Sequence, residues 1–243
     1  MLGKFINHKE DSLTAAVFTH LLHLPVELFW QILRNASYTT TLPEDPGDLL
    51  QVNFWPSWNP SGTNNTQRVV PDLFLRFGNL DLVIEAKRWD DWMQDHAQWQ
   101  SELIAYTNEY GEEKRPVRMI ALGGIHTTPD EELSYDWHSR IDESSASSVD
   151  RHRYLCPVHM CRWSRLLEQC TRMHRELQSL EYRSSQARAF LRILVDVIDL
   201  FAWHGFSTGL WFVDFRFAKC RLSPSIASHA QFFQSRSKQL ATK

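Results

Sequence analysis

The chain has 243 residues, of which 43% are hydrophobic and 23% are charged, a balance typical of a globular protein with one large domain. No stretch approaches the run of about 20 apolar residues that a membrane helix needs, and the first ten residues lack the apolar core of a secretory signal. We therefore expect a cytoplasmic protein that does not enter a membrane. The formal charge of −3 does not by itself indicate a nucleic-acid binder.

Two helices are predicted near the beginning of the chain. Apolar residues recur at three- and four-residue spacing between Leu13 and Leu22, which indicates an amphipathic helix with Ser12 as its N-cap. Pro25 suits the first turn of a second helix over residues 25–33.

The next segment, residues 36–69, contains proline, glycine and asparagine throughout and is predicted mostly as loop. One strand is expected inside it, at 49–55, as the first strand of the core sheet. The aromatic run at 54–60 allows two interpretations. It is either a loop that stacks on nucleic-acid bases or a loop that packs on the domain through its own tryptophans, and we favour the second.

Residues 70–87 carry the functional interpretation. Two strands are predicted there, joined by a tight Gly-Asn turn, since both residues adopt positive φ at little cost. Side chains alternate along a strand, so Glu85 and Lys87 share one face. Pairing around the turn places Asp72 beside them. Two carboxylates and a lysine at the end of a buried hairpin suit a hard cation such as Mg²⁺, with the lysine orienting the attacking water.

The sequence Pro71-Asp72, followed by Glu85-Ala86-Lys87, resembles the motif of the PD-(D/E)xK nuclease superfamily. The resemblance covers roughly residues 10–125. It implies an α/β fold of the restriction-endonuclease-like type, a mixed central sheet flanked by helices, to which this chain adds a helical C-terminal portion. It also implies hydrolysis of DNA with Mg²⁺ as cofactor, for which Mn²⁺ can substitute. Phage defence and mobile-element processing are common settings for such proteins.

The resemblance implies further members of the site. Many members carry an acidic residue on the first helix, a role for which we prefer Glu10 to Asp11. Many also carry a Gln or Tyr on the helix after the Glu-x-Lys strand, where Gln98 is the nearest candidate and Gln100 its competitor, the alternative being an exposed polar face. The implied metal ligands are Asp72, Glu85, Glu10 and the backbone carbonyl of Ala86, with Lys87 and Gln98 as further catalytic residues.

The remaining elements follow from periodicity. On a helix predicted at 93–109, Gln98, Glu102 and Tyr106 line one face because they lie four residues apart. A buried strand is expected at 117–125. Further along, we predict a strand at 154–160, helices at about 162–178 and 184–204 with Gly205 as a C-cap, and a strand or hairpin near 211–217.

We expect one continuous domain with three segments: a nuclease-like core over 1–125, a mobile loop or insertion over 126–150, and a strand and C-terminal helices over 151–243 that pack on the core. The cysteines are Cys156, Cys161, Cys170 and Cys220. With His159, the first three have a spacing that matches no usual zinc arrangement, so we predict buried free thiols.

Three functional hypotheses remain. The first is a metal-dependent DNA nuclease, whose strandedness preference and cut position the sequence leaves open. The second is a weak or inactive nuclease-fold subunit that binds DNA or a protein partner, as a homodimer or within a larger complex, which the near-neutral charge favours. The third is an α/β protein without a site, which predicts that Asp72, Glu85 and Lys87 point apart.

Overall fold

A computed structural model describes residues 10–38, 42–91, 93–125, 156–179 and 185–207. The chain divides into two compact units, Met1–Ser207 and Thr208–Lys243, and the described residues all belong to the first. They form five α-helices, one short 3-10 helix and five strands, which confirms the predicted α/β class. No helix among them is long and apolar enough to cross a membrane.

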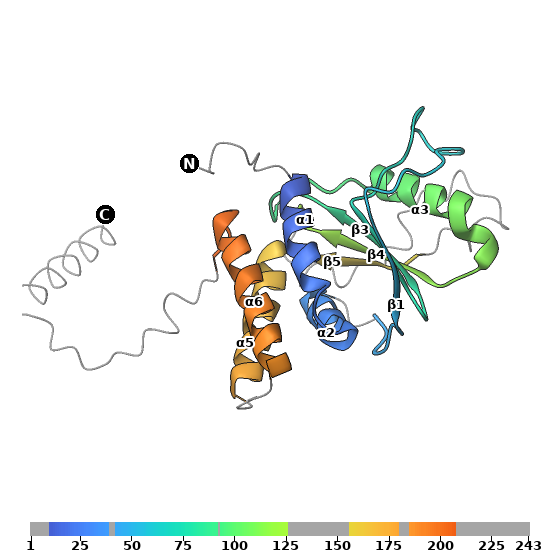
Figure 1. Ribbon diagram of the computed structural model, residues 1–243. Coiled ribbons are helices and arrows are strands. Elements are labelled where there is room, and N and C mark those ends of the chain that lie inside the picture. Colours follow the sequence, from blue (N-terminus) through green and yellow to red (C-terminus); the bar gives the residue numbers. More distant parts are fainter. Residues whose placement is uncertain (1–9, 39–41, 92, 126–155, 180–184, 208–243) are drawn as a thin grey trace, which may run out of the picture. The chain divides into compact units, whose positions relative to one another are not determined.

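The five strands form one open mixed sheet in the order β1-β2-β3-β4-β5 (Figure 1). The first three, β1 (Leu49–Phe54), β2 (Leu73–Phe77) and β3 (Asp81–Ala86), form an antiparallel meander. They are followed by β4 (Val117–Leu122), parallel to β3, and by β5 (Val158–Cys161), parallel to β4. Every residue of β3 is buried, because helices cover both faces of the sheet at this strand.

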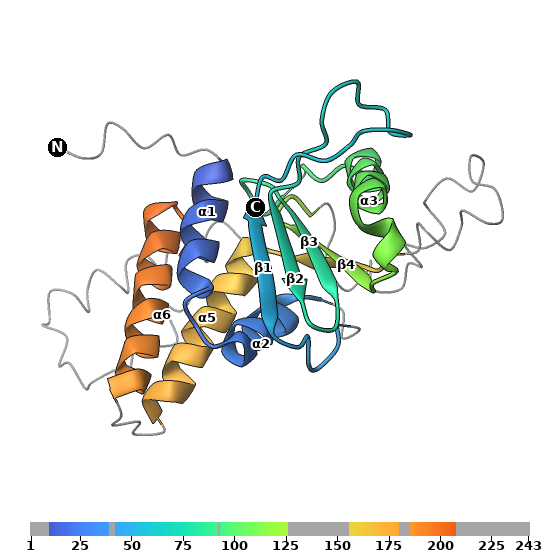
Figure 2. The same ribbon diagram turned by 45° about the vertical axis from the view of Figure 1, so that its right-hand side comes forward.

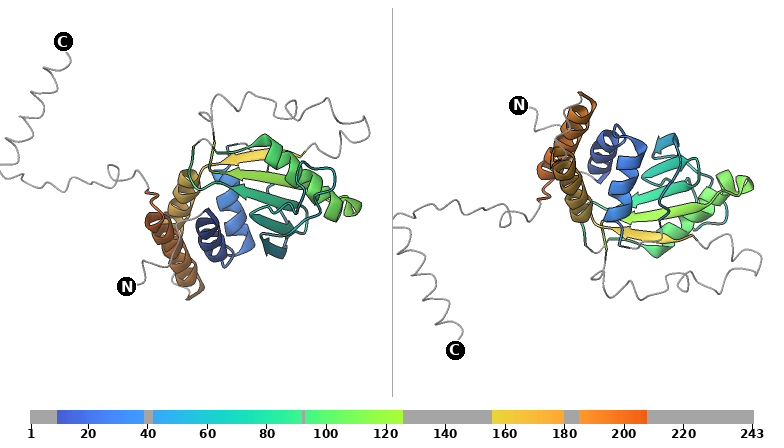
Figure 3. Two further views of the ribbon diagram at one scale, coloured as in Figure 1. Left: turned by 90° about the horizontal axis from the view of Figure 1, so that it is seen from above. Right: turned by 90° about the horizontal axis from the view of Figure 1, so that it is seen from below.

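The helices are divided between the two faces (Figure 3). One face is covered by α3 (His96–Tyr110), which the short helix η1 (Gly111–Glu113) follows. On the other side of the sheet lie α1 (Glu10–Leu21), α2 (Val26–Ala36), α5 (Trp163–Ser179) and α6 (Ser185–Trp203), and α6 packs against α1 and α5. Each lies within a few residues of its predicted position.

Alternation along β3 decides which side chains face α3. Val83 packs with Trp99 of α3 in one apolar cluster, whereas Leu82 and Ile84 belong to the larger cluster under the other four helices. Glu85 is two residues beyond Val83 and therefore faces α3. The end of β3 thus lies against α3, on the helix face that carries Gln98 and Glu102.

Some predicted boundaries differ from the observed ones. α1 begins at Glu10, so Ser12 lies inside the helix and is not its N-cap. β5 begins at Val158, later than predicted. The predicted loop over 126–150 and the predicted strand at 211–217 lie outside the described residues.

Glycine ends a helix as predicted but does not shape the hairpin turn as predicted. Gly205 has a φ of +89° just after α6, which confirms the C-cap. At the turn between β2 and β3, neither Gly78 nor Asn79 has a positive φ. The turn is held instead by their N–H groups, which donate to the carbonyls of Asp48 and Pro46, both at 2.8 Å.

Candidate active site

The candidate site lies at the end of the sheet where β3 finishes and β2 begins. The register pairs Leu73 with Ile84, so Asp72 lies opposite Glu85 one position further on. The Asp72 carboxylate accepts a hydrogen bond from the backbone N–H of Ala86, with 2.8 Å between Oδ2 and N. Asp72 and Glu85 are only 7% and 2% exposed. The hairpin therefore brings two carboxylates into the interior at one strand end.

Lys87 is held by two partners on the α3 face of the sheet. Its Nζ donates to Glu85 Oε1 at 2.5 Å and to Gln98 Oε1 at 3.0 Å. The Nε2 of Gln98 in turn donates to Glu85 Oε1 at 2.7 Å. These three bonds close a triangle that fixes the direction of the ammonium group. The structure therefore does not show the divergence of Glu85 and Lys87 that a protein without a site would have.

Glu102 is a buried carboxylate that we did not include in the predicted site. It is 1% exposed, its Oε1 accepts from Gln98 Nε2 at 3.1 Å, and its Oε2 has no hydrogen-bond donor. Burial raises the pKa of Glu102 well above its ordinary value, and the neighbouring carboxylates of Glu85 and Asp72 raise it further. The Glu102 and Glu85 carboxyl groups touch, so a proton or a cation is needed between them to remove the repulsion.

Two glycines at the end of β4 make room for Lys87. Gly123 and Gly124 have φ values of +69° and +64°. A Cβ on Gly124 would lie 2.9 Å from both Cβ and Cγ of Lys87, and one on Gly123 would lie 2.5 Å from the Lys87 carbonyl oxygen. That carbonyl also accepts from Trp163 Nε1 at 2.7 Å. The Gly-Gly pair, which matches no phosphate-binding motif in the sequence, therefore allows β4 to pass close to the lysine.

The loop after β3, residues 88–95, is fixed to its surroundings at both ends. Near α3, the Gln94 side chain donates to the carbonyl of Gly123 at 3.1 Å and accepts from Trp99 Nε1 at 2.7 Å. Near β3, the Asp90 carboxylate accepts from two backbone N–H groups at the start of α5, at 2.6 and 3.1 Å. These contacts fix the position of α3 relative to the site. Nothing in the sequence distinguishes Gln94 from other glutamines in loops.

The other predicted members are placed as follows. Glu10 is the first residue of α1, and its side chain lies outside the described part of the structure, whereas Asp11 is exposed. In Figures 1 and 2 the first turn of α1 lies toward the same end of the sheet as the site. Gln98, not Gln100, supplies the contact from α3 to Lys87. The Ala86 side chain belongs to the apolar cluster on the opposite face.

The donor chemistry of the site suits a hard divalent cation. In the described part of the chain, no three Asp, Glu, His or Cys side chains are gathered in the way that holds a metal ion. Two carboxylates in contact, Glu85 and Glu102, nevertheless offer the number of protein ligands that Mg²⁺ sites commonly use together with water and substrate phosphate. The Glu102 oxygen without a donor is the kind of atom that such an ion would satisfy, and Asp72 lies beside the pair.

The three described cysteines do not converge on one point. Cys156 belongs to the apolar cluster beneath α3, whereas Cys161 and Cys170 belong to the cluster on the other face of the sheet. All three are buried free thiols, as predicted, and burial raises the pKa of Cys156 and Cys170 to about 12. Cys220 lies outside the described residues.

The aromatic run after β1 divides into a buried and an exposed tryptophan. Trp58 is 2% exposed and packs edge-on against Phe74 and Tyr106, which confirms the packing interpretation for this residue. Trp55 is 40% exposed and has a φ of +49°, and its N–H donates to the carbonyl of Asp72 at 3.1 Å. One aromatic ring therefore remains exposed next to the site.

A cavity of about 490 Å³ opens beside the site, between α3 and the returning part of the loop that joins β1 to β2. We call it the α3 groove. The loop side and the helix side contribute five residues each, namely Asn64, Asn65, Arg68, Val69 and Val70, and Asp95, Ala97, Gln98, Ser101 and Glu102. Because Gln98 and Glu102 line it, the groove ends on the buried carboxylates.

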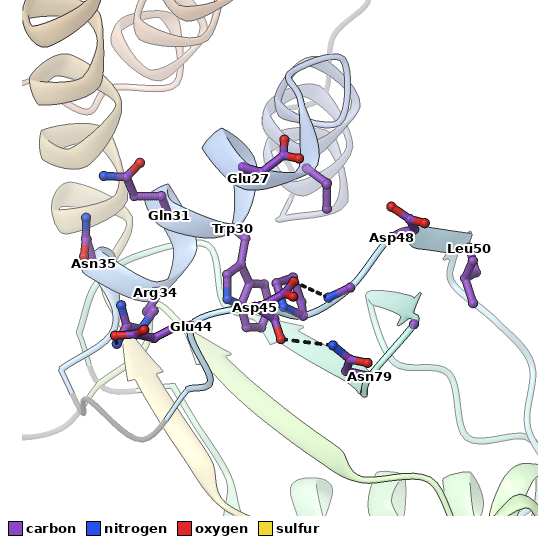
Figure 4. A pocket seen from close by; sticks show the side chains of 14 residues that line it. Glu27, Trp30, Gln31, Arg34, Asn35, Glu44, Asp45, Asp48, Leu50 and Asn79 are labelled. Atoms are coloured by element: carbon purple, nitrogen blue, oxygen red, sulfur yellow. Dashed lines mark hydrogen bonds and ion pairs between the residues drawn. The ribbon is translucent and has the colours of Figure 1, made fainter.

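A larger cavity of about 860 Å³ lies at the opposite end of the sheet, between α2 and the β2–β3 turn (Figure 4). It contains four acidic residues, two of which serve local structure. The Asp45 carboxylate accepts from the N–H of Gly47 at 2.8 Å, and Glu44 pairs with Arg34 at 3.5 Å. The turn residues Gly78 and Asn79 line this cavity, but Asp72, Glu85 and Lys87 do not, so we place the candidate site at the other end of the sheet.

Comparisons with known proteins add little to this geometry. No family model matches the chain, and no solved structure matches it significantly. An uncharacterized protein of Pasteurella multocida (strain Pm70) is 28% identical to it over 207 residues, which are 81% of this chain and 69% of that relative. The chain is thus similar along most of its length to a protein whose name states no activity, and the functional argument rests on the site itself.

Proposed function

We propose that this protein is a metal-dependent nuclease that hydrolyses DNA phosphodiester bonds at the site formed by Asp72, Glu85, Lys87, Gln98 and Glu102. One observation carries the proposal. A lysine and two mutually touching buried carboxylates, joined through one glutamine, lie at the end of a buried strand. Structural ion pairs join opposite charges, whereas here two buried carboxyl groups face each other and need a proton or a cation between them.

The fold supports the restriction-endonuclease-like assignment. In the family resembled, a helix follows the Glu-x-Lys strand directly, and the next strand lies parallel to its neighbours. Here α3 follows β3, and β4 pairs with β3 in parallel register. The helical C-terminal portion corresponds to α5 and α6, which pack against α2 and α1 respectively.

In this proposal Glu85 and Glu102 hold the cation, with Asp72, the Ala86 carbonyl and Glu10 as the remaining ligands. When bound, Mg²⁺ supplies polarisation of the scissile phosphate and stabilisation of the leaving oxygen. Mn²⁺, which also accepts oxygen ligands, serves in its place.

The chain's own residues provide orientation and charge. The Lys87 ammonium is a donor only, so it orients the attacking water through the water's lone pair and offsets charge on the phosphate. Gln98 is a positioning residue, because its amide binds Lys87 through one end and Glu85 and Glu102 through the other. The burial of Glu85 strengthens each of these electrostatic contacts.

The test is cleavage of single-stranded, double-stranded and branched DNA by the purified protein with Mg²⁺ or Mn²⁺. We expect cleavage by the parent and a loss of roughly 100-fold or more for Lys87→Ala and Glu85→Ala. Glu112→Gln, which changes an exposed carboxylate on η1, is the matched control and should cleave like the parent. The proposal fails if the parent cuts none of these substrates or if Lys87→Ala cuts equally well.

A second candidate is a nuclease-fold binding subunit, and β1 provides the observation that favours it. This strand is at the edge of the sheet, and its Leu50 and Val52 are 61% and 36% exposed, as an edge that pairs with another chain would have. In that case the protein would be dimeric or would bind a partner, and Glu85→Ala would leave this association unchanged. Light scattering of the parent and of a Val52→Lys variant distinguishes the two functions.

A further inference from the structure

The α3 groove and the candidate site share two side chains. Gln98 and Glu102 line the groove and also contact Lys87 and Glu85. Glu102 is almost completely buried and its Oε2 has no hydrogen-bond donor. A ligand in the groove therefore lies directly against the residues that we assign to the reaction.

The two walls of the groove differ in charge. The loop wall carries the exposed guanidinium of Arg68 and the amides of Asn64 and Asn65, whereas the outer part of the helix wall carries the exposed carboxylate of Asp95. Glu102, at the inner end of the helix wall, is a ligand of the cation in the proposed function and adds no negative charge to this comparison. A phosphate is attracted to Arg68 and repelled by Asp95. The donors on a base edge, by contrast, suit carboxylate acceptors. This asymmetry matches one strand with its backbone on one side and its bases on the other.

The size of the groove sets a second limit. Its volume of about 490 Å³ lies in the lower part of the range of roughly 300–1,000 Å³ that is usual for small-ligand sites. One nucleotide fits this space, and a stacked base pair does not. A duplex would also place one of its two rows of phosphates against the Asp95 carboxylate of the helix wall.

Hydrogen bonds within the loop and from the loop to α3 hold the loop wall of the groove. The loop is closed by a bridge between Trp58 and Val69, with backbone hydrogen bonds of 2.8 and 3.2 Å. Its outgoing arm is tied to α3 by Asn108, whose amide donates to the carbonyls of Asn59 and Ser61 at 2.9 and 2.8 Å. Because the loop is already held in place, less conformational entropy is lost when a ligand binds.

We propose that the α3 groove binds an unstacked nucleotide of a single DNA strand, with Arg68 on its phosphate and the α3 wall on its base. This inference rests on the proposed function and deepens it, since it names single-stranded DNA as the substrate class. The duplex is a poor substrate on this view, because a nucleotide must first leave the stack at a cost of a few kcal/mol.

The experiment measures fluorescence anisotropy of a labelled single strand and of the duplex of the same sequence, with Ca²⁺ in place of Mg²⁺. We expect the parent to bind the single strand at least about tenfold tighter than the duplex, which corresponds to about 1.4 kcal/mol. Arg68→Ala should lower the slope of log affinity against log salt by about 0.7, the value for one phosphate contact on a single strand. Arg68→Lys should retain the slope.

The matched control is Arg172→Ala on α5, whose side chain is 51% exposed on the other side of the sheet. It should leave both the affinity and the salt slope unchanged. Equal or tighter binding of the duplex overturns the inference, and so does an unchanged salt slope in Arg68→Ala.

Cleavage assays with Mg²⁺ on the same variants separate the two proposals. Duplex cleavage that does not depend on Arg68 keeps the nuclease function and removes the single-strand inference. Single-strand binding that depends on Arg68, without hydrolysis in any metal, keeps the inference and removes the nuclease function.

Discussion

Replacing Gly124 by alanine tests whether the end of β4 is shaped to accommodate Lys87. The φ of +64° costs an L-residue about 1–2 kcal/mol. The new Cβ would also lie 2.9 Å from Cβ and Cγ of Lys87 and 3.0 Å from the backbone nitrogen of Gln94, and overpacking of this kind costs about 1–3 kcal/mol. The free energy of unfolding should therefore fall by roughly 2–5 kcal/mol.

Gly205→Ala provides the matched control. Gly205 also has a positive φ, +89°, but a Cβ there meets nothing within 4 Å, so only the backbone strain of about 1–2 kcal/mol applies. Urea denaturation of both variants measures the difference. We also expect Gly124→Ala to lose DNA cleavage at temperatures where it is folded, because Lys87 is displaced, and Gly205→Ala to keep it. Equal losses of stability and equal activities in the two variants would refute the reasoning.

Three further predictions concern other parts of the molecule. Burial, with a smaller effect of Arg118, lowers the pKa of His159 to about 4, so between pH 6.5 and 4 the unfolded chain binds more protons than the folded one. The free energy of unfolding should therefore decrease as pH falls through this window, by up to about 3 kcal/mol. Denaturation of the parent and of His159→Gln at several pH values should show this decrease in the parent and not in the variant. Asp81, at the start of β3, is 0% exposed and accepts hydrogen bonds from Arg76 and Arg115. Asp81→Asn should therefore lower the free energy of unfolding by about 3–5 kcal/mol, as measured by thermal or urea unfolding. The variant should retain cleavage below its melting temperature, because the site is at the other end of the strand. Gln98→Ala should reduce cleavage about 10–100-fold and shift its pH profile, since Lys87 and Glu85 lose a shared partner, whereas Gln100→Ala should behave like the parent in the same assay.

The parts of the site that lie on one hairpin could be predicted from the sequence. Glu85 and Lys87 share a face because strand side chains alternate with a period of two, and the turn length places Asp72 across from Glu85. These inferences need only local geometry and the pairing of neighbouring strands. Gln98 came from the family resemblance, which implies a Gln or Tyr on the helix after the Glu-x-Lys strand.

The parts that depend on tertiary packing could not be predicted in this way. The sequence placed Glu102 on the same helix face as Gln98, but its contact with Glu85 depends on how closely α3 approaches the sheet, which Trp99 and Leu103 set by packing on Val83. The role of Gly124 depends on how closely the ends of β3 and β4 approach each other, and this distance cannot be read from the sequence. The α3 groove requires a loop to fold back over a helix that lies 25 to 38 residues further along the chain, which no periodicity indicates.

The central claim is that the buried carboxylates beside Lys87 hold a divalent cation, and titration of Mn²⁺ into the protein without DNA tests it most directly. We expect calorimetry to show a site in the parent whose affinity falls about 10–100-fold or more in Glu85→Gln, and Glu112→Gln to match the parent. An isotherm for Glu85→Gln that is indistinguishable from that of the parent would contradict the claim.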